Sequence, residues 1–73
     1  MNGEKIGKLV AERRKALRLC QQELADLSEV NINTVVALES GKGNPRLETL
    51  LKVAEVLGME LIIKIKDNDY EKW

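Results

Sequence analysis

The sequence predicts a mainly α-helical domain of four helices, or five with a short extra turn, followed by one C-terminal β-strand. Apolar residues recur at spacings of three and four as far as residue 57, which is typical of amphipathic helices. Gly41, Pro45 and Gly58 interrupt this spacing where helices are expected to end or begin. After Gly58 the apolar period becomes two, as in a strand.

Length and composition restrict the possible functions. The chain has 73 residues, a size at which one core is barely sufficient, so a partner subunit is expected. With one cysteine and no histidine, we predict no disulfide, no metal site and no cofactor. No apolar run reaches about 18 residues and no signal peptide is recognisable, so we predict a cytoplasmic protein without membrane contact.

Charge is distributed unevenly along a chain whose net charge is zero. Residues 1–20 contain six basic and two acidic side chains, whereas residues 21–40 contain four acidic and no basic ones. A basic end can supply a nucleic-acid footprint even in a neutral protein. The basic cluster can equally be a solvated helix face, so charge alone leaves DNA binding undecided.

The first helix is predicted over residues 4–18, with Asn2 as N-cap. Its apolar residues share helical spacing and make the helix amphipathic: Ile6, Leu9, Val10 and Leu17. The second helix begins at Gln21 and is predicted to turn three residues inward: Leu24, Ala25 and Leu27.

The third helix is capped by Asn31 and directs Leu38 and either Thr34 or Val35 inward. Its opposite face is the surface that we expect the protein to present. Four residues make up that face: Ile32, Asn33, Val36 and Ala37.

The fourth helix, about residues 46–57, has an apolar stripe wider than one core contact requires, so one side is expected to meet a second molecule. Residues 59–66 alternate as a strand, which needs a partner ladder. Because the other segments are helical, we predict pairing with the same strand of a second chain. The predicted homodimer contacts are Val53, Val56, Leu61, Ile63 and Ile65. The chain thus divides into a helical domain (1–58), a dimerising strand (59–66) and a polar, flexible tail (67–73).

A linked series of motifs extends over about residues 5–58: a basic first helix, Gln-x-x-Leu-Ala, an Asn cap, Thr-Val, Leu-Glu, Gly-Lys, Asn-Pro and a closing Leu-Gly. This series resembles the helix-turn-helix domain of the Xre family, which includes phage Cro and repressor proteins. The terminal strand resembles that of HipB-type antitoxins, transcriptional regulators whose C-terminal strands pair across a dimer.

The resemblance implies roles for individual residues. Bases in the major groove would be contacted by Ile32, Asn33, Val36 and Ala37. The DNA backbone would be contacted by Gln21, Asn31, Thr34, Lys42, Gly43 and Asn44. Arg14 and Glu39 would form a structural pair that ties the first helix to the end of the third.

Three departures from the family pattern affect these expectations. Glu29 stands where the family has glycine, so a positive φ there would cost roughly 1–2 kcal/mol. Cys20 replaces a Ser or Thr cap, so we expect the second helix to be less firmly capped. The reading face is mostly aliphatic, and only Asn33 can form a bidentate bond with adenine, which predicts A·T-rich half-sites.

The leading hypothesis is a nucleoid-associated, homodimeric repressor that binds double-stranded DNA at an inverted repeat, and that could be the antitoxin of a toxin-antitoxin pair. The alternative is an interaction subunit that neutralises a toxin protein without binding DNA, with Ile32 and Val36 buried against that protein. An enzyme is the poorest hypothesis, because no histidine or paired carboxylate is placed for catalysis.

Overall fold

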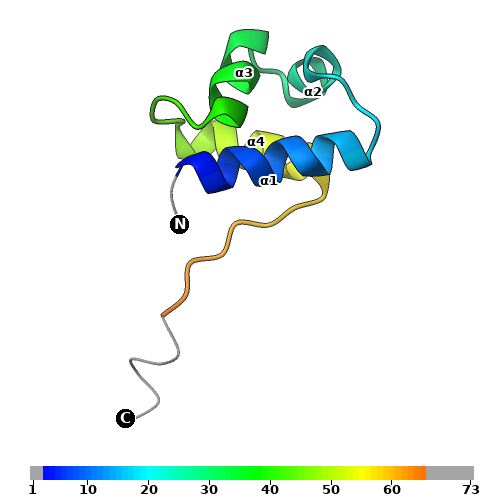
Figure 1. Ribbon diagram of the computed structural model, residues 1–73. Helices are drawn as coiled ribbons and strands as arrows, with labels where there is room; N and C mark the ends of the chain where they lie inside the picture. The colour runs from blue at the N-terminus through cyan, green and yellow to red at the C-terminus, as the bar shows by residue number, and fades with distance from the viewer. Residues whose placement is uncertain (1–2, 66–73) are drawn as a thin grey trace.

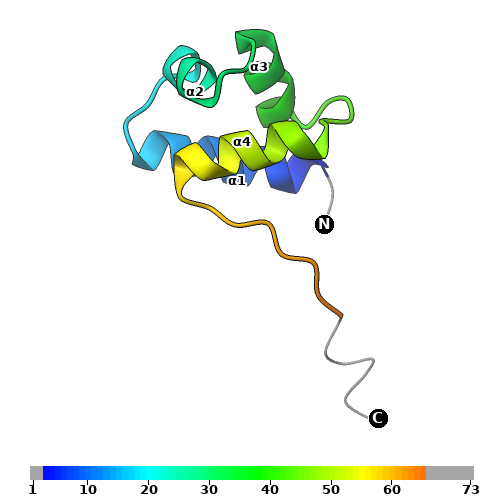
Figure 2. The same ribbon diagram turned by 180° about the vertical axis from the view of Figure 1, so that it is seen from behind.

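The structure, a computed structural model, describes residues 3–65 and contains four helices in that range. They are α1 (Gly3–Ala16), α2 (Gln21–Ser28), α3 (Ile32–Ser40) and α4 (Leu47–Leu57). Helices α1 and α4 lie side by side, and α2 and α3 lie together on one side of them (Figures 1 and 2). Residues 59–65 leave this bundle on the other side (Figures 1 and 2).

The first helix is shorter than predicted. It ends at Ala16 because the chain turns at Arg18, which has a φ of 61°. Leu17 therefore lies beyond the helix and is exposed, and Leu9 of the predicted apolar set is exposed as well. The predicted N-cap, Asn2, lies outside the described residues.

The second and third helices begin where the sequence predicts. The buried face of α2 consists of Leu24, Ala25 and Ser28, which places Leu27 on the outer side with 58% of its surface exposed. The prediction that Leu27 points inward was therefore wrong. On α3 the inward residues are Val35 and Leu38, whereas Thr34 is only half-buried.

The core is aliphatic and draws on all four helices. Its fully buried members are Val10, Leu24, Ala25, Val35, Leu38, Val53 and Leu57. Val53 is only 1% exposed, because it faces the other helices, so its predicted role as a dimer contact was wrong. Val56 is half-buried and packs against the core. The apolar stripe of α4 nevertheless extends past the core, since Leu47 and Leu51 are exposed.

Gly7 allows α1 to approach the end of α3 closely. A Cβ atom at this position would overlap the backbone carbonyl of Leu38 and would lie 2.7 Å from that of Glu39. Only glycine fits without a backbone shift. This contact fixes the C-terminal end of α3 against the first turns of α1.

The predicted strand is not formed within the described part of the chain. Residues 59–65 have no regular secondary structure, and the last backbone hydrogen bond before residue 65 runs from the Met59 N–H to the Ala54 carbonyl (2.9 Å). A strand requires a second strand, and residues 3–65 of one chain offer none. Pairing across a homodimer stays a prediction. Residue 66 and the predicted tail, residues 67–73, lie outside the described residues.

Candidate nucleic-acid interface

A buried ion pair between Arg14 and Glu39 joins α1 to the end of α3. Glu39 accepts hydrogen bonds from the Arg14 Nε (2.6 Å) and Nη2 (2.9 Å) atoms. The Arg14 Nη1 atom donates to the Leu19 carbonyl at 2.8 Å, and the hydrogen bond to Glu39 raises the pKa of Arg14. The two side chains are 11% and 7% exposed, so the pair is shielded from water. It holds the end of α3 against α1 and the start of α2.

Gln21 belongs to the same network. Its Nε2 atom donates to the Glu39 Oε1 atom at 3.1 Å, and the residue is half-buried. The side chain that was predicted to contact a phosphate is thus directed toward Glu39. The backbone N–H of Gln21 still lies at the N-terminal end of α2, where anions are favoured.

The N-terminal end of α2 carries a capping box. The Cys20 Sγ atom accepts the Glu23 N–H at 3.4 Å, and the Glu23 Oε1 atom accepts the Cys20 N–H at 2.8 Å. These two bonds form a complete capping box, and the expectation that a thiol caps less firmly than a hydroxyl stays a prediction. The backbone hydrogen bond from Cys20, followed by that of its thiol, lowers the pKa of Glu23. The Glu23 carboxylate compensates for the weak thiol acceptor.

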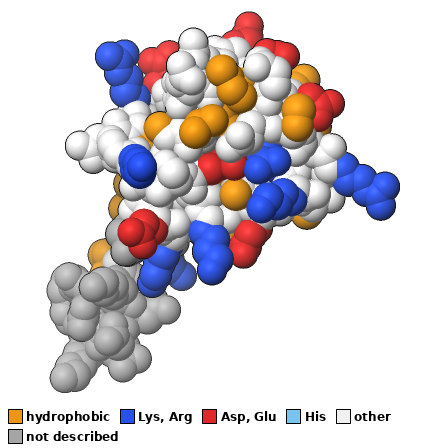
Figure 3. All heavy atoms as spheres, turned by 45° about the horizontal axis from the view of Figure 1, so that its top comes forward, with side chains coloured by type: hydrophobic (Ala, Val, Ile, Leu, Met, Phe, Trp, Pro, Cys, Tyr) orange, Lys and Arg blue, Asp and Glu red, His pale blue; other side chains and the backbone are white. Residues whose placement is uncertain are grey.

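Helix α3 exposes three of its four predicted base-contacting residues. Asn33 and Ala37 are exposed, and Val36 is 44% exposed. Ile32 is instead half-buried and packs against the core, so only part of its side chain is accessible. Asn31 caps α3, since its Oδ1 atom accepts the Asn33 N–H at 2.7 Å. Figure 3 shows hydrophobic side chains scattered over the α2–α3 side, with basic ones mainly along α1 and at the edges.

The loop after α3 lies beside the exposed face of α3. Asn33, Thr34 and Ala37 line a hollow of about 280 Å³ together with the loop residues Lys42, Gly43 and Asn44. The structure therefore brings predicted base-contacting and backbone-contacting residues to one surface. Gly41 begins this loop as the left-handed C-cap of α3, with a φ of 77°.

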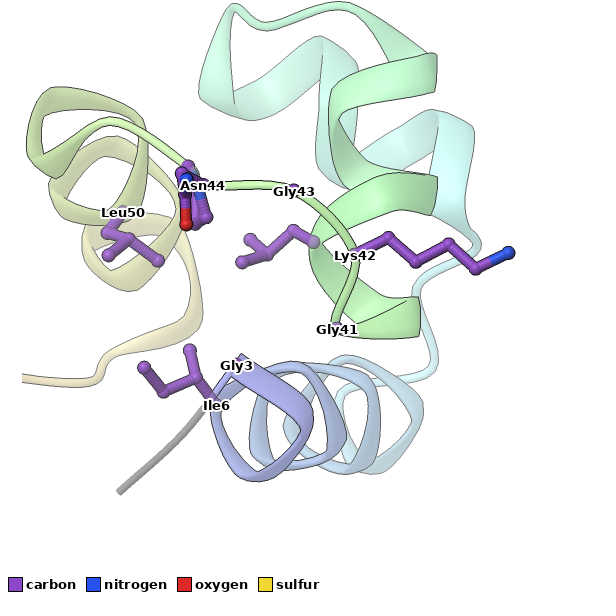
Figure 4. Close-up of a pocket in the computed structure, with 9 residues that line it drawn as sticks. Gly3, Ile6, Gly41, Lys42, Gly43, Asn44 and Leu50 are labelled. Carbon is purple, nitrogen blue, oxygen red and sulfur yellow. The ribbon is translucent and has the colours of Figure 1, made fainter.

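A second cavity, of about 310 Å³, lies behind the loop. Ile6 of α1 and Leu50 of α4 line it, and Lys42 points away from it toward the surface (Figure 4). The same two side chains also line an apolar groove between α1 and α4. Ile6 and Leu50 thus separate the space behind the loop from that groove.

The turn between α2 and α3 carries the strain that the sequence suggested. Glu29 has a φ of 58° and a ψ of 42°, and its N–H bonds to the carbonyls of Ala25 and Asp26. Next to it, the buried Ser28 Oγ atom has no hydrogen-bond partner. This unpaired Ser28 hydroxyl could not be predicted from the sequence, because serine is common at helix ends.

Two further contacts between helices were not predicted. The Arg13 Nε atom donates to the Leu57 carbonyl at 2.8 Å and thereby fastens α1 to the end of α4. Gly7 sets the distance from α1 to α3. Both contacts join residues far apart in sequence, so local spacing could not reveal them.

The described residues include no helix long and apolar enough to cross a membrane. Within residues 3–65, His, Cys, Asp and Glu side chains also form no group of three or more that could hold a metal ion. The surface beside α3 is the candidate site, because exposed residues of α3 and the loop after it line one hollow there.

Comparison with known proteins agrees with this geometry. A family model described as helix-turn-helix matches residues 10–63. The chain belongs to this helix-turn-helix family. The match includes all of α2, α3 and α4, and it confirms the resemblance to Xre-type proteins.

Relatives within the helix-turn-helix family are named as regulators. An uncharacterized HTH-type transcriptional regulator of Methanothermobacter thermautotrophicus is 42% identical over 66 residues, which cover 88% of this chain and 96% of that protein. A putative HTH-type transcriptional regulatory protein of Methanococcus vannielii is 36% identical over 64 residues, 88% of this chain but 20% of that protein. The CTXphi transcriptional repressor RstR of Vibrio cholerae is 33% identical over 57 residues, 78% of this chain and 51% of that protein.

Proposed function

We propose that this protein is a transcriptional repressor that binds double-stranded DNA at an inverted repeat as a homodimer. The observation that carries the proposal is the surface on which exposed α3 residues and the Lys42–Asn44 loop line one hollow. A helix of this kind can enter the major groove while the adjoining loop contacts the phosphates. The names of the relatives are those of transcriptional regulators, which supports regulation of transcription rather than catalysis.

The chemistry of α3 favours particular base pairs. Asn33 can bond adenine in the major groove, whereas Val36 and Ala37 can pack against thymine methyl groups. We therefore propose A·T-rich half-sites about 34 Å apart, with much of the affinity supplied by phosphate contacts and DNA shape. A homodimer would place its two α3 helices in successive major grooves.

The test is binding of labelled DNA from the protein's own upstream region. We expect retardation at low salt, and we expect Asn33→Ala to weaken binding by about tenfold and to relax the preference for adenine. The control is Glu55→Gln, because Glu55 is exposed on α4 and outside the hollow. Absence of binding by the wild-type chain, or unchanged affinity and preference in Asn33→Ala, would overturn the proposal.

An antitoxin role is a second, compatible proposal. The outer side of α2 combines the exposed Leu27 with two acidic residues, Asp26 and Glu29, a surface suited to a basic protein partner. In this role the protein would bind a toxin encoded by the adjacent reading frame and would repress their shared operon. Coexpression with that neighbour tests it: a stable complex weakened by Leu27→Glu supports the role, and separate elution of the two proteins contradicts it.

A further inference from the structure

An apolar groove of about 260 Å³ lies between α1, α4 and the segment that follows Gly58. Eight of its nine lining residues are apolar, and Glu60 is the charged one. Helix α1 contributes Ile6, Leu9 and Val10, and the segment contributes Leu61 and Ile62. Leu9 is exposed at this groove, so the groove is open to a partner.

The segment 59–65 itself lacks the contacts that its composition requires. Its aliphatic side chains are exposed, up to 101% of the reference surface for Ile63. Within residues 3–65, its backbone makes no hydrogen bond after that of Met59. Apolar side chains and unpaired backbone groups in succession are the features of a strand that pairs with another chain.

We propose that two copies of the chain pair these segments antiparallel about Ile62, so that the Ile63 side chain of each copy covers the α1–α4 groove of the other. The inference rests on the homodimer of the proposed function and adds the register and the surface that it buries. In a two-fold arrangement every contact occurs twice.

The order of residues selects this register. With Ile62 opposite its own copy, Glu60 lies opposite Lys64, Leu61 opposite Ile63, and Met59 opposite Ile65. Every opposed pair then matches in character, apolar with apolar and acid with base. A shift by one residue places Glu60 opposite Ile63 or Ile65, and a parallel in-register pairing places Glu60 opposite Glu60, which is destabilising.

The register also explains how the groove is covered. Successive side chains of a strand point to opposite faces, so on pairing Leu61 would stay at the groove and Ile62 would turn away from it. The Ile63 that lies opposite Leu61 in the second copy would then take the place of Ile62 beside Leu9. The Ile63 side chain is fully exposed in one chain and would become buried in the pair. Burial of such a side chain removes apolar surface from water and so favours the pair, which accounts for the apolar lining of the groove.

Disulfide trapping tests the register. In a Cys20→Ser background, Ile62→Cys places the two thiols opposite each other at the symmetry axis, and mild oxidation should yield a covalent dimer in high yield. Lys64→Cys is the matched control, because its two copies would lie roughly 13 Å apart along the strands, beyond the Cα separation of about 7 Å that a disulfide tolerates. Equal trapping of both variants, or trapping of neither, would overturn the register.

Exchange of charges provides a second readout. Glu60→Lys and Lys64→Glu should each weaken dimerisation about tenfold in sedimentation experiments, since two like-charged pairs form per dimer, and the double variant should restore it. Failure of the double variant to recover would contradict the pairing of Glu60 with Lys64.

The groove requires its own test. Leu9→Glu should weaken the dimer at least tenfold, whereas Leu17→Glu, at an exposed position outside the groove, should leave it unchanged. Anilinonaphthalene sulfonate is the probe for an open groove. Leu9-dependent fluorescence of this dye, at concentrations where the wild-type chain is dimeric, would show that no second copy covers the groove. DNA binding by the wild-type chain is measured separately. Failure of the register therefore leaves the proposed repressor function intact, and failure of DNA binding leaves the register intact.

Discussion

Within residues 3–65, two residues other than glycine, Arg18 and Glu29, have left-handed backbone conformations. This conformation costs an L-amino acid roughly 1–2 kcal/mol, and glycine avoids that cost but loses more entropy on folding. We expect Glu29→Gly to raise the free energy of unfolding by about 1 kcal/mol, measured by urea denaturation.

Gly58 supplies the matched control for Glu29. It has a φ of 67°, and an added Cβ would meet only the Arg13 Nη2 atom, at an ordinary distance of 3.5 Å. Gly58→Ala should therefore lower the free energy of unfolding by about 1 kcal/mol through backbone strain alone. Changes of the same sign in both variants would contradict this explanation.

Lys42 is predicted to contact a DNA phosphate. Lys42→Ala should reduce the slope of log affinity against log salt by about 1, without changing sequence preference. Lys52→Ala removes the same charge from α4, where Lys52 pairs with Glu48 at 3.5 Å, and should leave the slope unchanged. The measurement is fluorescence anisotropy of labelled operator DNA at several salt concentrations. Equal slopes for both variants would contradict a phosphate contact by Lys42.

Glu23 provides a pH-dependent contribution to stability. Its pKa is lowered in the folded chain by the hydrogen bonds from Cys20, so the folded state favours the ionised carboxylate. This stability is present above the unfolded pKa of about 4.3 and is lost as the pH falls through the lower, folded value. Thermal denaturation across that acidic range should therefore be less pH-dependent in Glu23→Gln than in the wild-type chain. Identical pH profiles would contradict the capping box.

At the scale of the elements, the approach of α1 to α3 depends on Gly7. Alanine favours helices, so Gly7→Ala would stabilise an isolated helix by about 0.5–1 kcal/mol. Here we expect the opposite, a loss of about 1–3 kcal/mol, because the added Cβ collides with the carbonyls of Leu38 and Glu39. Lys8→Ala, at the exposed neighbouring position, should change stability by less than about 0.5 kcal/mol. Chemical denaturation distinguishes the two outcomes.

Local signals in the sequence were sufficient to predict where α2 and α3 begin. Gln21 follows a cap, Asn31 supplies the next cap, and Gly41 ends α3, and each acts within its own turn. The end of α1 could not be predicted in this way. The chain just after this helix end accepts a hydrogen bond from the Arg14 side chain at the Leu19 carbonyl, a contact that spacing does not reveal. The orientation of Leu27 and Ile32 likewise depends on which helices lie beside them.

The candidate site was predicted mainly by family resemblance. Periodicity placed Asn33, Val36 and Ala37 on the outer face of α3, and the structure exposes all three. The proximity of Asn33 and Ala37 to Lys42 and Asn44 could be inferred from the family but not from spacing. Gln21 and Glu39 are 18 positions apart, so local spacing could not predict that the Gln21 side chain turns inward to contact Glu39.

At the scale of the whole molecule, the exposed segment 59–65 is expected to determine oligomeric state. Deletion of residues 59–66 should convert a dimer into monomer or aggregate, because α4 alone exposes only Leu47 and Leu51 as large aliphatic residues. Light-scattering mass measurement checks this outcome. A deletion variant that stayed a clean dimer would assign the pairing to α4.

Ile6 and Leu50 border both the cavity behind the Gly41–Pro45 loop and the α1–α4 groove. Because protein interiors are close-packed, a change in the volume of either side chain displaces atoms on both sides. Single substitutions at these positions should therefore alter the affinity of the dimer for its operator as well as subunit affinity, whereas a substitution at Asn33 should alter operator affinity alone. During evolution, a substitution at Ile6 or Leu50 would therefore change operator affinity and subunit affinity in the same step.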